Sequence, residues 1–581
     1  MTFQPKRHAV FPLVALATGL AGQAQAAVLR LSPPPGAVDA IFERYDSPST
    51  PGCSVAVIED GKVLFQKSYG MADVALAVER RDDTVHWLPY SETRVFVALA
   101  VAMLARDGKL GLDDAVRKHV PELPAYASAV TVRQLLHHTS GLADYGVLDP
   151  AFNSMETPVS EDEFFRVLHR WGKLGFPPGQ GQMYSNTDYG LLKILVERKT
   201  GGSLHDYLHA TLLEPLGMTH TRIGASQAGA YPGHALFSEA GTGGWGRVLG
   251  YRRSPTGGIS VTTNLQDIVR WDAALRNPAL GLADLLRSLE AGAPPQATDA
   301  GQASFSFGVF RRQHRGIPLV AFHGVGEYTY LVQVAGTALS VATLCNFYPG
   351  MESFGPDVAR LYVGPSAPAT TTPDPQASPS TDAAPMPGPP VKLATDELRA
   401  YAGEYRNARG NFRATISVAG DTLRITPQGS EPMPALTPIG DGQFTSEFDG
   451  ATYVLSFKPG ESDLVMSAWD ITNNTSGGED LFRWTPATWA TETQVAAYAG
   501  TYEGEDIDVV LYVRVDGSRV YVASRGAAEE IIEPKSETDA FQGPSIYTTR
   551  FERDQAGRVV SLVLDATRVK GMRYRLRSPS D

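Results

Sequence analysis

The chain has 581 residues, of which 43% are hydrophobic, 20% charged and 9% aromatic. One hydrophobic core rarely organises a chain of this length, so we expect a soluble globular protein of three or more domains. The formal net charge of -12 is spread along the chain, which disfavours nucleic acid as a partner because nucleic-acid-binding proteins need a basic face.

The first 26 residues have the features of a secretory signal peptide. Lys6 and Arg7 precede an apolar run over residues 10–20, and Ala24-Gln25-Ala26 supplies the small residues that signal peptidase requires. The run is too short to span a bilayer comfortably, and no later segment has that length. We therefore expect residues 1–26 to be removed and the mature protein to be periplasmic or secreted, without a membrane span. An uncleaved anchor is the alternative.

The region that follows begins with a predicted β-hairpin. Its two β-runs, residues 54–59 and 63–68, are joined by Asp60-Gly61, a strong turn dipeptide. The two cysteines, Cys53 and Cys345, each belong to a strand-like run. Export would place both in an oxidising compartment, where a disulfide can persist.

Residues 95–105 are apolar nearly all round and end at Asp107-Gly108, which predicts a helix buried on all sides. Ser91 stands at the start of this helix. Serine is a preferred N-cap residue. By itself, Ser91 therefore indicates no chemistry.

A segment rich in Pro, Ala, Ser and Thr, residues 364–392, is predicted to be a linker. After it, short alternating runs separated by turn residues are typical of meandering antiparallel sheet. The motif that ends in Tyr405 (YAGEY) is echoed by the motif that ends in Tyr502 (YAGTY). We therefore expect two copies of one barrel-like β-domain, residues 393–488 and 489–581, after a first domain over residues 27–363.

A series of motifs in the first domain points to one family. In chain order the motifs are Ser91-Glu92-Thr93-Arg94, Gly108-Lys109-Leu110, Leu136-His137-His138-Thr139-Ser140-Gly141-Leu142, Tyr184-Ser185-Asn186, Glu214-Pro215-Leu216-Gly217 and His323-Gly324-Val325-Gly326. This series resembles the serine β-lactamase family of class C type, which also holds penicillin-binding carboxypeptidases, esterases and D-aminopeptidases. The resemblance covers about residues 40 to 360. It implies an α/β (α+β) domain of the β-lactamase/transpeptidase type, with an antiparallel sheet flanked by helices.

The resemblance also implies roles for individual residues. Ser91 would be the nucleophile and Tyr184 a proton-handling group. Asn186 would be a positioning amide, and His323 would be the basic residue on the strand that lines the site. The oxyanion would be held by the backbone N–H groups of Ser91 and Gly326. The reaction would be acyl transfer to Ser91 followed by hydrolysis of a small amide, peptide or ester, and cell-wall fragments would suit the compartment.

Two departures from the family pattern bear on activity. The family has lysine where this chain has Arg94, and a guanidinium cannot take a proton from serine. A fixed positive charge within a few ångströms can lower the pKa of a tyrosine by about one to three units from about 10, so Tyr184 would be the base. In addition, Val325 stands where glycine is common. A catalytically impaired protein that binds a ligand or the cell wall is therefore the alternative.

Other polar residues are weaker candidates for a functional role. His138 is disfavoured as a catalytic base because no acidic residue is evident beside it. No cofactor is expected, and His119, His205 and His209 lack the spacing of a metal site. In the family fold, the first and last strands of the main sheet are antiparallel neighbours. That would bring Cys53 opposite Cys345, either as a disulfide or as two buried thiols.

Overall fold

The fold is taken from a computed structural model of the whole chain. It describes residues 31–88, 94–148, 160–224, 234–241, 244–247, 261–290, 304–314, 317–323, 329–347, 354–363, 389–407, 413–427, 432–448, 451–459, 464–470, 475–476, 481–484, 490–524, 529–535, 538–542, 547–566 and 568–577. The predicted signal peptide and most of the predicted linker lie outside these residues. Within them, no helix is long and apolar enough to cross a membrane.

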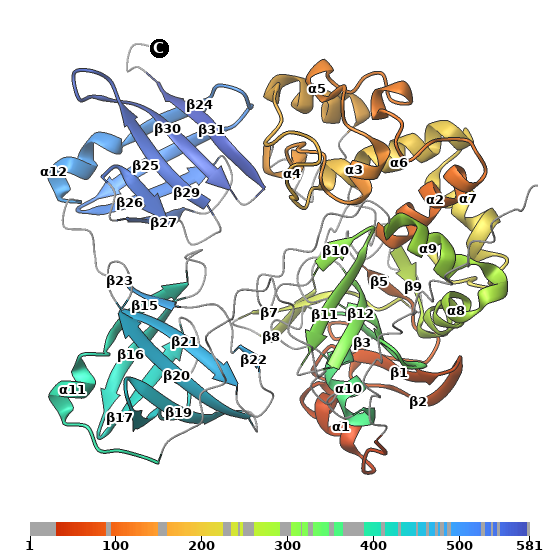
Figure 1. The fold of residues 1–581 in the computed structure, drawn as a ribbon, viewed down its shortest axis with the longest axis horizontal. Helices are drawn as coiled ribbons and strands as arrows, with labels where there is room; N and C mark the ends of the chain where they lie inside the picture. Colours follow the sequence, from red (N-terminus) through yellow and green to blue (C-terminus); the bar gives the residue numbers. More distant parts are fainter. Residues whose placement is uncertain are drawn as a thin grey trace, which may run out of the picture.

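Residues 31–363, called the N-terminal domain here, are built on a seven-stranded antiparallel sheet (Figure 1). Its strands, in spatial order, are β10 (Ser304–Ser306), β11 (Val309–His314), β12 (Ile317–His323), β13 (Thr329–Val334), β14 (Leu339–Cys345), β1 (Cys53–Glu59) and β2 (Lys62–Ser68). The predicted hairpin is confirmed, because β1 and β2 pair across Asp60 and Gly61, both of which have a positive φ. This arrangement confirms the expected antiparallel sheet.

The described α-helices of the domain are α1 (Ala37–Phe42), α2 (Arg94–Arg106), α3 (Val132–Leu136), α4 (Tyr145–Leu148), α5 (Glu161–Trp171), α6 (Asn186–Thr200), α7 (Leu204–Leu208), α8 (Leu265–Arg276), α9 (Leu282–Glu290) and α10 (Phe354–Tyr362). Helices α8 and α10 pack on the sheet, and the other described helices of the domain pack mainly on one another beside it (Figure 1). Three small sheets complete the domain: β3 (Met71–Asp73) with β4 (Val78–Glu79), β5 (His86–Leu88) with β9 (Val261–Thr263) and β6 (Arg222–Ile223), and β7 (Ser238–Gly241) with β8 (Gly244–Arg247).

Strand β14 is buried along its whole length because helices pack on both faces of the sheet. On one face Ser340 Oγ donates a hydrogen bond to Asp272 of α8, at 2.7 Å. On the other face Thr343 lies against Gly355 of α10. Successive strand residues point to opposite faces, so a strand covered on both sides is buried at every residue, and its two polar side chains, Ser340 and Thr343, face the covering helices.

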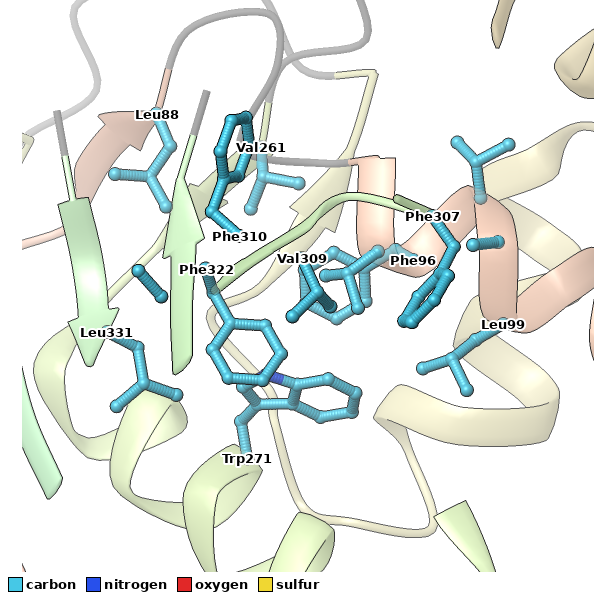
Figure 2. Close-up of a cluster of buried hydrophobic side chains, with 14 of the residues drawn as sticks. Leu88, Phe96, Leu99, Val261, Trp271, Phe307, Val309, Phe310, Phe322 and Leu331 are labelled. Atoms are coloured by element: carbon cyan, nitrogen blue, oxygen red, sulfur yellow. The ribbon is translucent and has the colours of Figure 1, made fainter. Parts of the chain in front are cut away.

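Part of the core of the N-terminal domain is a cluster of aromatic and aliphatic side chains (Figure 2). Phe96 and Leu99 of α2 lie in one cluster with Trp271 of α8 and Val309 of β11. Every residue of α2 from Arg94 to Leu104 is buried. The prediction of a helix buried on all sides is therefore confirmed, and this burial fixes the helix that carries Arg94.

A disulfide joins the first residue of β1 to the last residue of β14. Cys53 and Cys345 are directly opposite in the β1–β14 ladder, with an S–S distance of 2.03 Å. Of the two alternatives left open by the sequence, the structure has the bridge rather than two thiols. The bridge closes a loop of 292 residues, which covers nearly all of the N-terminal domain.

Residues 389–484, the middle domain, are all-β apart from α11 (Thr395–Arg399). The strands are β15 (Gly403–Asn407), β16 (Arg413–Ala419), β17 (Thr422–Pro427), β18 (Thr437–Gly440), β19 (Gln443–Phe448), β20 (Ala451–Pro459), β21 (Leu464–Asp470), β22 (Thr475–Ser476) and β23 (Leu481–Trp484). An isolated bridge between Leu423 of β17 and Leu436 connects the two ends of the sheet. The domain is therefore barrel-like.

Residues 490–577 form a closed eight-stranded barrel, called the C-terminal barrel, preceded by α12 (Glu492–Val495). The strands are β24 (Gly500–Gly504), β25 (Val510–Asp516), β26 (Arg519–Ser524), β27 (Glu530–Pro534), β28 (Ala540–Gln542), β29 (Tyr547–Arg553), β30 (Val559–Ala566) and β31 (Val569–Leu576). Its strands β24 and β31 lie beside α4 and α5 of the N-terminal domain (Figure 1).

The two tail domains repeat one aromatic arrangement. The second tyrosine of each motif, Tyr405 or Tyr502, donates a hydrogen bond to the carbonyl of the first, Tyr401 or Tyr498, at 2.9 and 2.8 Å. Each pair of tyrosines contacts two phenylalanines at matching places, Phe444 and Phe457 in one domain and Phe541 and Phe551 in the other. The two tail domains therefore share one aromatic arrangement on corresponding strands, and their origin by duplication stays a prediction.

Candidate active site

The structure brings together three of the residues singled out from the sequence. Arg94 is the first residue of α2, and Tyr184 and Asn186 flank the N-terminus of α6. Ser91 and Gly326 lie outside the described residues. His323 ends β12, where its backbone pairs with Thr329, and nothing is described of its side chain.

The start of α6 is fixed by local capping and by the preceding loop. Ser185 is the N-cap, and its side chain accepts a hydrogen bond from the backbone N–H of Thr187 at 3.2 Å. The Thr187 hydroxyl donates to the carbonyl of Ala143 at 2.6 Å and accepts from the N–H of Tyr145 at 2.9 Å. These bonds hold Tyr184 and Asn186 against the loop that follows α3.

Arg94 is buried, and its guanidinium lies over the face of Tyr184, with Cζ 4.1 Å from the ring centroid. Its Nη2 donates to Asn186 Oδ1 at 2.7 Å, and its Nη1 donates to the carbonyl of Ser185 at 3.2 Å. A planar fork of donors can bind an amide and a carbonyl while it stacks on a ring. The guanidinium is therefore held against both Tyr184 and Asn186.

A turn of the central sheet supports Arg94 from behind. Gly308, between β10 and β11, has a φ of 78°, and a Cβ there would lie 2.3 Å from the backbone nitrogen of Val95 and 2.8 Å from Cβ of Arg94. Only glycine allows this approach. No local sequence signal marks Gly308, because its role depends on a contact with a helix more than 200 residues earlier.

Asn186 connects Arg94 to a second arginine through a buried carboxylate. Asn186 Nδ2 donates to Asp144 Oδ2 at 3.2 Å, and Arg568 Nη1 donates to the same oxygen at 3.0 Å. Arg568 belongs to the C-terminal barrel, and its Cζ lies 5.0 Å from the centroid of the Tyr184 ring. Two guanidinium groups from different domains therefore flank one tyrosine.

The structure corrects the interpretation of His138. Its Nδ1 lies 3.0 Å from Asp188 Oδ2, so an acidic partner is present after all, supplied by α6 fifty residues later. Asp188 also accepts a hydrogen bond from Ser140 Oγ at 2.6 Å. Asp188 follows the Tyr184-Ser185-Asn186 motif by two residues, and the sequence did not pair it with His138 because the two are 50 residues apart.

The pKa values of this pair move in opposite directions. Burial, followed by the charges of Arg94 and Arg568, lowers the pKa of His138 well below its usual range. Burial raises the pKa of Asp188 well above its usual range, against the opposing effects of Ser140 and Arg94. His138 is therefore uncharged at neutral pH, and it packs on the Tyr184 ring with centroids 4.6 Å apart.

The arrangement suits electrostatic and proton-transfer chemistry. No group of three or more His, Cys, Asp and Glu side chains that could hold a metal ion occurs in the part of the chain that the structure describes. Arg94 supplies a permanent positive charge but cannot act as a base. Burial and the neighbouring arginines keep the His138 imidazole from taking up a proton, so the phenolic oxygen of Tyr184 is the better proton acceptor of these three residues.

Comparison with known proteins gives the family. The beta-lactamase family profile matches residues 38–364, more than half of the chain. Protein flp of Staphylococcus aureus is 32% identical over 191 residues, which are 32% of this chain and 37% of that protein. Penicillin-binding protein 4* of Bacillus subtilis is 33% identical over 171 residues, which are 29% of this chain and 37% of that protein.

A solved structure supports the fold alone. The octameric penicillin-binding protein homologue from Pyrococcus abyssi has a TM-score of 0.52 and 20% identity, and the match covers 77% of this chain and 99% of that one. This chain matches little more than a third of the length of these curated relatives, so their activities do not transfer to it by similarity. The family match over residues 38–364 nevertheless shows that the chain belongs to the beta-lactamase family.

Proposed function

We propose that the protein is an exported serine hydrolase that transfers an acyl group to Ser91 and then hydrolyses it. The observation that carries the proposal is the placement of Arg94, three residues after Ser91, over the Tyr184 ring and in hydrogen-bond contact with Asn186. Residues three apart in a helix share one face. Ser91 would therefore be presented toward the same tyrosine, and the substrate would be a small amide, peptide or ester.

In this mechanism Arg94 acts through its charge. Ser91 Oγ attacks the carbonyl carbon of the substrate and its proton passes to the oxygen of Tyr184, while backbone N–H groups of Ser91 and Gly326 hold the oxyanion. The two guanidinium groups beside Tyr184 stabilise the negative charge that this oxygen carries before it takes the proton. The same proton then goes to the leaving group, and water attacks the acyl-enzyme.

A second candidate function is ligand binding without turnover. The observation in its favour is that Arg94 occupies the position of the family's lysine, with both terminal nitrogens hydrogen-bonded, and a guanidinium cannot act as a base. Such a protein would keep the pocket and bind a peptide or cell-wall fragment.

Labelling and turnover separate the two functions. We expect a fluorophosphonate probe to label the mature protein and to fail on Ser91→Ala. On a chromogenic ester, we expect Tyr184→Phe to lower kcat by about 10²–10⁴. Absence of labelling in the wild-type protein would favour the binding function.

Arg94→Lys tests the role of arginine directly. We expect turnover to fall, because one ammonium group cannot bind Asn186 and the Ser185 carbonyl in the planar geometry of a guanidinium. A rise of several orders of magnitude would show that Arg94 disables the site. Sequencing the N-terminus of the secreted or periplasmic protein tests export, with Ala27 as the expected first residue.

A further inference from the structure

We propose that Arg568 of the C-terminal barrel forms a subsite for a carboxylate group of the substrate, next to Tyr184. The inference rests on the proposed hydrolase function and assigns its specificity. It makes the barrel a part of the active site rather than an appended module.

The barrel packs against α4 and α5 of the N-terminal domain, and this contact fixes the position of Arg568. Trp171 of α5 and Leu148 of α4 belong to the same buried apolar cluster as Val495, Tyr498 and Tyr502 of the barrel. Ion pairs lie at the edge of this contact, Arg170 with Asp508 at 3.4 Å and Lys173 with Asp506 at 3.6 Å. Contacts that include a buried tryptophan resemble a domain core and fix orientation.

Arg568 is carried by the tight connection between β30 and β31, where a strand pair turns toward the N-terminal domain. Its Nη1 bonds to Asp144, which is fully buried and also bonded to Asn186. A buried carboxylate requires a partner charge. The cation that faces Asp144 directly is supplied by a residue 424 positions away in the sequence.

Exposure distinguishes the two arginines. Arg94 is 3% exposed and its terminal nitrogens bond to protein groups, so it is not placed to bind a substrate charge. The Arg568 side chain is 26% exposed, and among the described residues only its Nη1 has a hydrogen-bond partner. A guanidinium has five N–H donors. Arg568 can therefore keep Asp144 and still offer Nε and Nη2 to a ligand.

The charge around Tyr184 admits an anion. Two guanidinium groups lie over the ring, so the carboxylate of Asp144 and the charged Tyr184 oxygen of the proposed mechanism leave no net negative charge there. Asp188 lies beyond His138. Arginine binds planar carboxylates through paired donors. A substrate with a carboxylate near the scissile bond is thus preferred, and one with an ammonium group there is disfavoured.

Matched esters test the subsite. The probes are 3-acetoxybenzoate and 3-acetoxybenzamide, which differ only in carboxylate against carboxamide. We expect wild-type kcat/KM to favour the carboxylate by about tenfold or more, as one charge-assisted hydrogen bond implies. Arg568→Gln should bring the ratio close to unity, Arg568→Lys should leave part of it, and Arg170→Ala, at the same domain contact, should leave it unchanged.

A merely structural role for Arg568 predicts something different. Loss of docking alone would lower kcat/KM for both esters equally, and an unchanged ratio in Arg568→Gln overturns the inference. If the wild-type protein hydrolyses neither ester, the proposed function fails instead. The subsite is then judged by calorimetric binding of 3-acetamidobenzoate against 3-acetamidobenzamide to the same variants, and equal affinities of the wild-type protein for both would overturn it.

Discussion

At the scale of single residues, the N-terminal domain twice places a buried histidine beside a buried arginine. His138 lies 3.4 Å from Arg94 Nη1, and His86 lies 3.0 Å from Arg80 Nη1. In both histidines burial first, and then the neighbouring arginine, lowers the pKa well below its usual range. A protonated imidazole would put a second positive charge where water is absent, so both rings stay neutral.

His86 allows this effect to be tested away from the active site. Because its pKa is lower in the folded protein, the unfolded chain takes up a proton first as the pH falls below about 6.5, and the folded state loses stability by up to about 1.4 kcal/mol per pH unit. We expect His86→Gln to lack this loss. Unfolding curves should show that the variant is more stable relative to the wild-type protein at about pH 5.5 than at about pH 7.5. Parallel behaviour of the two proteins would contradict the prediction.

At the scale of elements, the active site depends on how closely a strand turn approaches a helix. The β10–β11 turn touches the first residues of α2 at Gly308, and the neighbouring Phe307 donates its N–H to the carbonyl of Leu136 in α3. One turn thereby holds two of the elements around Arg94. The buried α2 cannot shift to make room, because it is packed on every side.

Gly308→Ala is therefore expected to destabilise the N-terminal domain by several kcal/mol, through a clash with backbone and an unfavourable φ. Gly108→Ala is the matched control. Gly108 has a φ of 69° and open space around it, so alanine there carries only the backbone cost of about 1–2 kcal/mol. Thermal unfolding should separate the two variants. Equal loss would show that the turn can retreat from α2.

At the scale of the whole molecule, the C-terminal barrel and the N-terminal domain share a buried contact and a charged one. The buried contact is made by Trp171, which lies in one apolar cluster with residues of the barrel. The charged contact is the hydrogen bond between Arg568 and Asp144. The middle domain is tied to the barrel through Glu533, which accepts a hydrogen bond from Arg413 at 2.9 Å and pairs with Arg406. The three domains are thus linked through the barrel.

Trp171→Ala should weaken this docking by about 3–5 kcal/mol, the usual cost of removing a buried tryptophan side chain. We expect scanning calorimetry to show the barrel unfolding separately, at a lower temperature than the N-terminal domain. Asp506→Ala, which removes an exposed ion pair at the same contact, should change little. A single unchanged transition in Trp171→Ala would mean that the contact adds little stability.

The sequence by itself determined what is encoded within a few neighbouring residues. The β1–β2 hairpin, the buried helix α2 and the strand-rich tail follow from local periodicity and turn residues, and the described elements agree with them. The Tyr184-Ser185-Asn186 motif stands out only through resemblance to a family. Resemblance to a family also placed Cys53 opposite Cys345. Local patterns carry this information because each element has its own repeat.

Only the tertiary structure decided which groups surround the tyrosine. Asp188 reaches His138 across 50 residues, and Arg568 reaches Asp144 across 424. No periodicity in the chain signals such contacts, because they depend on how packed elements and docked domains bring distant side chains together. The charge around Tyr184 is a property of that packing, whereas the motif that contains Tyr184 is a property of the sequence.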